Sequence, residues 1–473
     1  MWTRTFAVLS LIVVVAGHPH AGAPVALPTG DDAVTHALNR LTFGPRPGDV
    51  ARVKALGLQA WIDQQLNPAR IDDAALTAAL ARLTTLSLDS QTIQREYSGP
   101  AMVERRDRQR VNPAMEPPNP GMRLPTEAQR RVRQVVADLE EAKLLRAIQS
   151  ERQLQEVLVD FWFNHFNVFA GKGATRNYAN EYEREAIRTH VLGDFRDMLE
   201  ASAKSPAMLF YLDNWQNVSE NSPSPRGAQR GLNENYAREL MELHTLGVDG
   251  GYTQADVQNV ARAFTGWTIK PREGSGTMFV PRLHDDKAKT VLGHVIKAGG
   301  GENDIEQVLD ILAAHPATAR HIATKLAIRF VSDTPPAALV ARAAARFTTT
   351  NGNLREVVRT IIISPEFFAP EADRAKVKTP LEFVASALRA TGAEVRTALP
   401  LARELRDMGM PLYFCQPPTG YDDTATPWVS AGALVSRMNF AVALGKNEIR
   451  GVRIANPPAD LGRDIGSPAF QRQ

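Results

Sequence analysis

The segment from residue 233 to residue 244 is the most polar stretch of the chain with helical periodicity. Residues three and four positions apart are neighbours on a helix, so one face would carry an amide, a guanidinium and two carboxylates. These residues are Asn235, Arg238, Glu239 and Glu242. The carboxylates suit acid–base catalysis or cation binding, with Arg238 keeping one of them ionised. The same pattern also fits a solvated face with internal Glu–Arg pairs.

His244 would project from the other, largely apolar side of this helix, near its end at Gly247. Residues 216–231 precede the helix and form a long loop rich in Ser, Asn, Pro and Gly. Long loops inside a compact domain are often functional, and Asp213 adds an acid ahead of this one. We therefore predict catalytic roles for Arg238, the two glutamates and His244, and substrate contacts for Asn235 and Asp213.

A second cluster is the aromatic run from Phe161 to Phe169, which must be substantially buried. Asn164 lies within it and needs a partner, because polar groups beside an aromatic core are costly when unpaired. We assign Asn164 to substrate binding and His165 to catalysis. His165 also fits a core histidine bonded to a backbone carbonyl.

A third cluster follows a predicted hairpin and contains His284 and Asp285. Histidine beside an acid on a loop suits cation binding, so these two residues are the metal candidates. A polar turn is the alternative. Trp267, at the start of the hairpin, is assigned to substrate binding.

Several established chemistries lack their motifs in this sequence. It contains no nucleotide-binding or haem motif, no His-Glu-x-x-His or Cys-x-x-Cys, and no Gly-x-Ser-x-Gly. Cys415 is the only cysteine, and nothing near it in sequence would lower its pKa to make it a nucleophile. The cofactor is therefore unknown, with a divalent cation as the candidate.

The elements that must position these residues are mostly helices. Helical periodicity recurs along the chain and predicts a mainly α fold, a large multi-helix globular body spanning 24–473. Strand signals are confined to one small hairpin near 265–282. Residues 96–125, rich in Arg and Pro, read as an irregular surface insertion.

The first 23 residues are typical of a cleavable signal peptide. One positive charge precedes an apolar run of 11 residues, Phe6 to Ala16, and Ala21-Gly22-Ala23 fits a small-x-small cleavage site. The run is too short for a transmembrane helix, and no later stretch is apolar enough to span a bilayer. These features predict export to the periplasm or the extracellular space.

The net charge of the chain indicates which class of partner to expect. Lys and Arg number 55 and Asp and Glu 52, which gives a net charge of +3. A nucleic-acid-binding protein of this size would carry a strong basic excess, so we expect no nucleic-acid partner. An envelope protein or polymer remains the expected partner.

Several motifs occur in an order that resembles one known family of exported bacterial proteins, catalogued as domain of unknown function 1800. The motifs are His36-x-x-Asn39-Arg40, Phe161-Trp162-x-Asn164-His165-Phe166, Asn235-x-x-Arg238-Glu239-x-x-Glu242-x-His244, Thr265-Gly266-Trp267, His284-Asp285 and Pro417-Pro418-Thr419-Gly420-Tyr421. The likeness spans about residue 30 to residue 473. It implies a mainly helical fold and an exported protein, and it implies no reaction.

Two hypotheses for function follow. The first is an envelope or extracellular enzyme, hydrolase- or lyase-like, that uses the carboxylates and histidines, with or without a bound cation. The second is a non-catalytic envelope binding or assembly protein in which the polar clusters are buried structural networks. Glutamates and a histidine lining one accessible pocket would favour the enzyme, whereas fully paired and sealed side chains would favour the second hypothesis.

Overall fold

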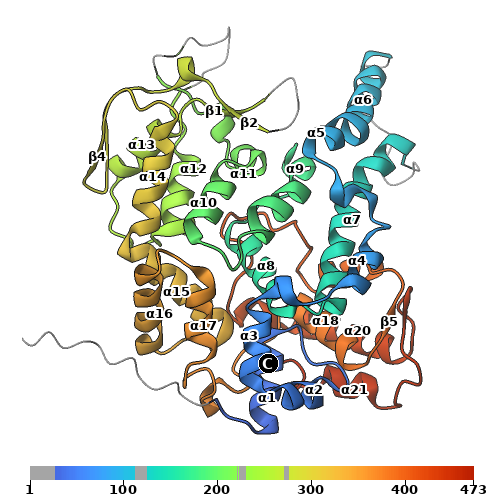
Figure 1. Cartoon of the computed structure of the whole chain (residues 1–473). Helices are drawn as coiled ribbons and strands as arrows, with labels where there is room; N and C mark the ends of the chain where they lie inside the picture. The colour runs from blue at the N-terminus through green and yellow to red at the C-terminus, as the bar shows by residue number, and fades with distance from the viewer. Residues whose placement is uncertain (1–26, 112–124, 221, 223–230, 271–275) are drawn as a thin grey trace, which may run out of the picture.

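The fold is mainly α-helical, as the periodicity predicted (Figure 1). A computed structural model describes residues 27–111, 125–220, 222, 231–270 and 276–473. In its first half the helices are α1 (Asp31–Leu41), α2 (Asp49–Leu56), α3 (Leu58–Gln65), α4 (Ala74–Leu80), α5 (Ser90–Ile93), α6 (Gly99–Val111), α7 (Glu127–Gln149), α8 (Gln153–His165), α9 (Thr175–Glu181), α10 (Phe195–Ala203) and α11 (Pro206–Tyr211). The predicted signal peptide, residues 1–23, lies outside the described residues.

The second half continues the helical pattern and adds small sheets. Its helices are α12 (Asn235–Glu239), α13 (Gln254–Ala263), α14 (Asn303–Ala314), α15 (Pro316–Phe330), α16 (Ala337–Thr349), α17 (Leu354–Ile362), α18 (Pro380–Ala390), α19 (Leu399–Asp407), α20 (Ala431–Gly445) and α21 (Leu461–Gly466). Its two-stranded antiparallel sheets are β1 (Trp267–Ile269) with β2 (Thr277–Phe279), β3 (Lys289–Val291) with β4 (His294–Ile296), and β5 (Glu394–Val395) with β6 (Val452–Arg453).

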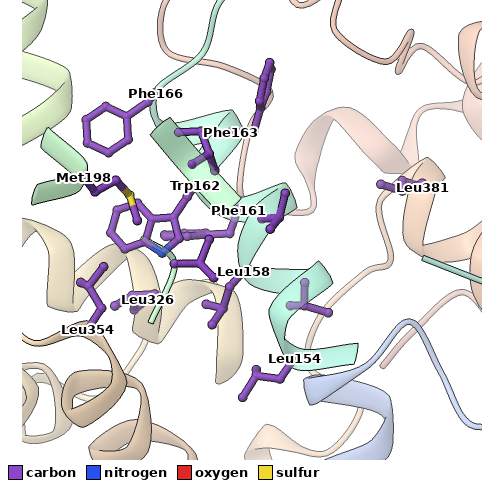
Figure 2. Close-up of a cluster of buried hydrophobic side chains, with 14 of the residues drawn as sticks. Leu154, Leu158, Phe161, Trp162, Phe163, Phe166, Met198, Leu326, Leu354 and Leu381 are labelled. Carbon is purple, nitrogen blue, oxygen red and sulfur yellow. The ribbon is translucent and has the colours of Figure 1, made fainter. Parts of the chain in front are cut away.

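Helix α8 lies at the centre of the molecule, between α10–α17 on one side and α7, α18 and α20 on the other (Figure 1). Its aromatic run supplies much of the core. Figure 2 shows Trp162 beside Met198, Leu326 and Leu354, three residues that come from α10, α15 and α17. Because large aromatic side chains contribute the most apolar area, this run holds distant helices together.

Local sequence signals explain several helix ends. Helices α2 and α3 follow each other directly but are separate, because Gly57 adopts φ 89° and ends α2 before α3 begins. Thr126 and Thr253 each form a capping box at the start of α7 and α13. Gly247 follows the helix that carries Glu242, with φ 83°, as a glycine stop signal requires.

The structure corrects two expectations drawn from composition. Residues 99–111 form α6 and are not irregular, because Pro100 falls in the first turn, where proline is tolerated, and good helix formers fill the rest. The next proline is Pro113, beyond the end of the helix. Residues 112–124 lie outside the described part. The hairpin of β1 and β2 is confirmed, but β3–β4 and β5–β6 were not predicted, since strands of two or three residues are too short to show a period.

Within the described part of the chain, no helix combines the length and the apolar character that crossing a bilayer requires.

Candidate functional site

The carboxylate pair lies where α12 runs directly into a π-helical segment, η6 (Leu240–Thr245). Glu239 ends α12 and is partly exposed. Burial, with the neighbouring charge of Glu242, raises the pKa of the Glu239 carboxyl above its ordinary value, and Arg238 only partly opposes this. No other described residue forms a hydrogen bond with the Glu239 side chain. Glu239 is therefore a carboxyl group with a perturbed pKa and a free side chain near the surface.

Glu242, one turn further on, has a different environment. The hydroxyl of Tyr252 donates a hydrogen bond to its Oε2 at 3.1 Å. Burial, and to a smaller extent the charges of Cys415 and Glu239, raises the pKa of the Tyr211 hydroxyl, which donates to the backbone oxygen of Gln416 at 2.6 Å.

Arg238 and Asn235 are on the same helix but face other partners. Arg238 lies 3.3 Å from Glu234 and donates to the amide oxygen of Gln254 at 2.8 Å. Its side chain is 41% exposed, so this ion pair is weak. The side chain of Asn235 donates to the carbonyl of Leu212 at 3.1 Å, which ties α12 to the end of α11.

His244 and His165 lie on the buried side of this helix, away from the carboxylates. The ring of His165 has its Nε2 3.1 Å from the backbone oxygen of His244, the arrangement expected of a core histidine. The ring of His321 comes from α15, with its Nε2 3.2 Å from the oxygen of Leu243. Its centroid is 6.1 Å from that of His165, which is also 6.1 Å from that of His244. Burial lowers the pKa of all three imidazoles, that of His244 to about 3, so they are neutral at ordinary pH.

Asn164 holds a loop rather than facing open solvent. Its side-chain nitrogen donates to the oxygen of Tyr421 at 2.8 Å, and its oxygen accepts from the backbone nitrogen of Tyr421 at 2.7 Å. Asn167 makes the same kind of contact with the carbonyls of Cys415 and Pro417. These amides fix residues 415–421 against α8. Burial raises the pKa of the Cys415 thiol to about 11, which keeps it protonated.

Asp213 and Trp267 also have partners in the described structure. The Asp213 carboxylate lies 2.7 Å from the ammonium of Lys172, and its backbone adopts φ 61°. Trp267 is buried, with the ammonium of Lys204 5.3 Å from the centre of its ring.

The two metal candidates point to different partners. His284 is buried with Nδ1 2.8 Å from the carbonyl of Thr265 and Nε2 3.2 Å from Asp304. The ammonium of Lys289 lies 2.6 Å from the same carboxylate and is fully buried. Asp285 instead accepts two hydrogen bonds from Arg262, at 3.0 and 3.1 Å. Among the described residues no group of three His, Cys, Asp or Glu side chains has an arrangement that would hold a metal ion.

The structure thus brings Glu239 and Glu242 together and places the histidines elsewhere: His165 and His244 lie together with His321, and His284 lies apart with Asp304. Sequence reasoning missed the residues that complete these sites, namely Tyr252, Tyr211, His321, Lys289 and Asp304. Tyr252 is close in sequence and follows a Gly-Gly turn, so its proximity to Glu242 could have been considered. Lys289 is also close in sequence, five residues after His284. Tyr211, His321 and Asp304 come from other elements, and one sequence carries no signal of such pairing.

Together these features define a helical protein with one partly exposed carboxylate pair and several buried polar networks. A family model described as "Protein of unknown function (DUF1800)" matches residues 36–472. Because the match covers nearly the whole chain, the protein belongs to this family, as its motifs indicated. No curated protein and no solved structure matches the chain.

Proposed function

We propose that this chain is an exported envelope or extracellular enzyme that performs acid–base chemistry, of the hydrolase or lyase type, at Glu239 and Glu242. The observation that carries the proposal is the contrast between the two carboxyls. Glu239 has a raised pKa and no described hydrogen-bond partner, whereas Glu242 accepts a hydrogen bond from Tyr252. Adjacent carboxyl groups in unlike environments are how enzymes separate an acid from a base.

The roles follow from these environments. Glu239 is the proton donor, because its raised pKa favours the protonated form. Glu242 is the base, oriented by Tyr252. The π-helical turn supports this assignment, since π-bulges within helices are frequent at functional sites. In a second version of this proposal, a cation binds between the two carboxylates, and Glu239→Gln would abolish cation binding.

Export rests on the N-terminal pattern. The charged start, the apolar run from Phe6 to Ala16 and the small residues at Ala21-Gly22-Ala23 all precede the family match. Expression with this segment should yield a shortened protein outside the inner membrane, which N-terminal mass spectrometry of the periplasmic and medium fractions would detect. A full-length product retained inside the cell would contradict export.

The catalytic test compares purified wild-type protein with Glu239→Gln and Glu242→Gln on a panel of envelope and extracellular polymers. We expect turnover of at least one polymer class and a loss of about a hundredfold or more in each variant. Glu234→Gln is the matched control, because Glu234 immediately precedes the same helix and its side chain pairs, among the described residues, with Arg238 and Gln254. Elemental analysis of the same samples tests the cation variant. Equal turnover in Glu239→Gln, with its fold intact, would overturn the proposal.

The buried networks favour a second candidate, a non-catalytic binding or assembly protein. His165, His284 and Asp285 each contact partners that explain them structurally. On this alternative no polymer is turned over, and Glu239→Gln raises stability, because it replaces a carboxyl that burial and a neighbouring charge disfavour when ionised. Turnover distinguishes the two candidates, because this gain in stability follows from the raised pKa of Glu239 on either of them.

A further inference from the structure

A cavity of about 710 Å³ lies where the end of α19 meets the loop that follows it and the segment that leads into α20. Its size is that of the sites that hold drug-sized ligands. Neither Glu239 nor Glu242 lines it, so it is separate from the carboxylate pair. Aromatic rings and prolines make up much of its walls, namely Phe414, Tyr421, Trp428, Pro411, Pro417 and Pro427.

Hydrogen bonds within the protein fix these walls. The hydroxyl of Tyr421 donates to the backbone oxygen of Pro411 at 2.7 Å, and the indole nitrogen of Trp428 donates to that of Asp422 at 3.3 Å. Asn164 holds the backbone of Tyr421 in place from α8. The cavity is therefore preformed, as a binding site requires. Because the polar atoms of Tyr421 and Trp428 are already paired, the two rings offer a ligand only apolar surface.

The charged residues of the cavity are both acidic. Among the described residues its lining includes Asp407 and Asp422 and no Lys, Arg or His. The Asp407 carboxylate forms no hydrogen bond or ion pair with another described residue. Asp422 accepts hydrogen bonds from the backbone nitrogen and the hydroxyl of Thr424 through Oδ1, at 2.8 and 2.7 Å, which leaves Oδ2 for a ligand. The cavity therefore repels anions and suits a ligand with a positive charge.

Asp407 is also in an unfavourable position within its own helix. It is the last residue of α19, where the helix dipole disfavours a negative charge. Burial, together with the neighbouring charge of Asp407, raises the pKa of the Glu404 carboxyl on the same helix. Proteins break local rules of this kind mainly at functional sites. A cationic ligand would supply the counter-charge that the described chain does not.

The apolar walls decide which kind of cation fits. A sugar polymer presents many hydroxyl groups, which are costly to bury without hydrogen-bond partners. A proline-rich peptide in the polyproline II conformation keeps its backbone solvated and packs its side chains on aromatic and proline surfaces. An arginine or lysine in such a peptide supplies the positive charge and interacts favourably with aromatic rings. The lining therefore favours a peptide over a polysaccharide.

We propose that this cavity binds an extended, proline-containing segment of a partner protein that carries an arginine or a lysine beside its prolines. The prolines pack on the rings of Phe414 and Tyr421, and the basic side chain lies between the carboxylates of Asp407 and Asp422. The contact is small, so we expect a dissociation constant of roughly 10–100 µM. Binding of this kind does not depend on the carboxylate pair and occurs whether or not the protein is an enzyme.

Fluorescence anisotropy of dye-labelled peptides with the purified exported protein tests the proposal. A peptide of about nine residues in the repeat Pro-Pro-Arg spans roughly 28 Å and should bind with the stated affinity. Gly-Gly-Arg repeats, with the same charge, and Pro-Pro-Glu repeats, with the opposite charge, should each bind at least about tenfold more weakly. No binding of Pro-Pro-Arg, or equal binding of Gly-Gly-Arg, overturns the proposal. Tighter binding of a chitosan oligomer would also overturn it and assign the cavity to an amino-sugar polymer.

The role of the two acids is tested with Asp407→Asn and Asp422→Asn, which remove charge and keep shape. Each should weaken Pro-Pro-Arg binding about threefold and both together about tenfold, since partly exposed ion pairs are individually weak. Glu448→Gln is the matched control, because Glu448 is exposed and does not line the cavity. Asp407→Asn should also raise the melting temperature of the free protein, because the helix end disfavours that charge. Unchanged affinity in the folded double variant overturns the proposal.

Cys415 reports where the peptide binds, because it is the only cysteine of the chain and lines the cavity. Its pKa of about 11 makes alkylation by iodoacetamide slow enough to follow by mass spectrometry at a pH of about 9. Saturating Pro-Pro-Arg peptide should slow this alkylation, and Pro-Pro-Glu should not. A rate that the bound peptide leaves unchanged would place the peptide elsewhere on the protein and overturn the proposal.

Discussion

At the scale of single residues, the clearest case of a buried charged group is Asp304. Its carboxylate is 1% exposed, and it lies 2.6 Å from the ammonium of Lys289 and 3.2 Å from His284. Lys289 also donates to the carbonyls of Asp285 and Lys287, so its charge is fully solvated by protein. Such a network contributes little when complete but is costly when one member is removed.

Asp304→Ala should therefore lower the free energy of unfolding by about 3–5 kcal/mol, because it leaves a buried ammonium without its counter-charge. Denaturant unfolding followed by circular dichroism measures the change. Asp310→Ala is the control on the same helix, where a 67% exposed carboxylate pairs with Arg196 and should contribute about 1 kcal/mol or less. Equal effects of the two substitutions would contradict a structural role for Asp304.

The sequence predicted which residue types would matter more reliably than it predicted their partners. Asn164 had to find hydrogen-bond partners because it lies within an aromatic run, and it does. That the partner is Tyr421, 257 positions away, follows only from the fold. The assignments of Asn164 to substrate and of His165 to catalysis stay predictions.

At the scale of elements, periodicity located most helices, and glycines decide where they end and where loops attach. Gly57 separates α2 from α3 with open space beside its Cα. Gly420 is different, because a Cβ there would lie 2.2 Å from the backbone oxygen of Asn164. Both have positive φ, so comparing them separates backbone strain from close packing.

Gly420→Ala should be far more destabilising than Gly57→Ala. The first displaces the loop of residues 415–421 from α8 and removes both Asn164 hydrogen bonds. The second costs backbone strain of about 1–3 kcal/mol, because φ 89° with ψ 132° is rarely adopted by alanine. Melting temperatures of the two variants, with Tyr421 fluorescence and proteolysis as reports on the loop, check the difference. If both glycines tolerate alanine equally, the close contact with α8 is not what fixes this loop.

At the scale of the whole molecule, buried histidines link stability to pH. The ordinary pKa of histidine is 6.5, and burial lowers that of His36 to about 4 and that of His244 to about 3. Below pH 6.5 the unfolded chain binds protons that the folded chain does not, so stability is lost as pH falls. At pH 5 each of these two histidines lowers the free energy of unfolding by about 2 kcal/mol relative to neutral pH.

Glu140 acts in the opposite direction. Burial raises the pKa of its carboxyl to about 7, so the folded chain binds a proton that the unfolded chain releases above pH 4.5. Its contribution to the free energy of unfolding is present at low pH and is lost as the pH rises through about 7. Between pH 7 and pH 5 this contribution offsets a loss of about the size that one of the two histidines causes. Because His165 and His321 also have lowered pKa values, the net change is destabilising.

We therefore expect the protein to lose stability between pH 7 and pH 5, measured by denaturant unfolding at each pH. His244→Leu should reduce this loss by about 2 kcal/mol and should also stabilise the protein at pH 7, because neither ring nitrogen of His244 has a hydrogen-bond partner among the described residues. Glu140→Gln should enlarge the loss, since it removes the opposing group. A pH dependence unchanged by both substitutions would mean that these side chains are hydrated in solution. If the His244→Leu protein is stable but does not turn over a polymer that the wild-type protein turns over, His244 has a catalytic role.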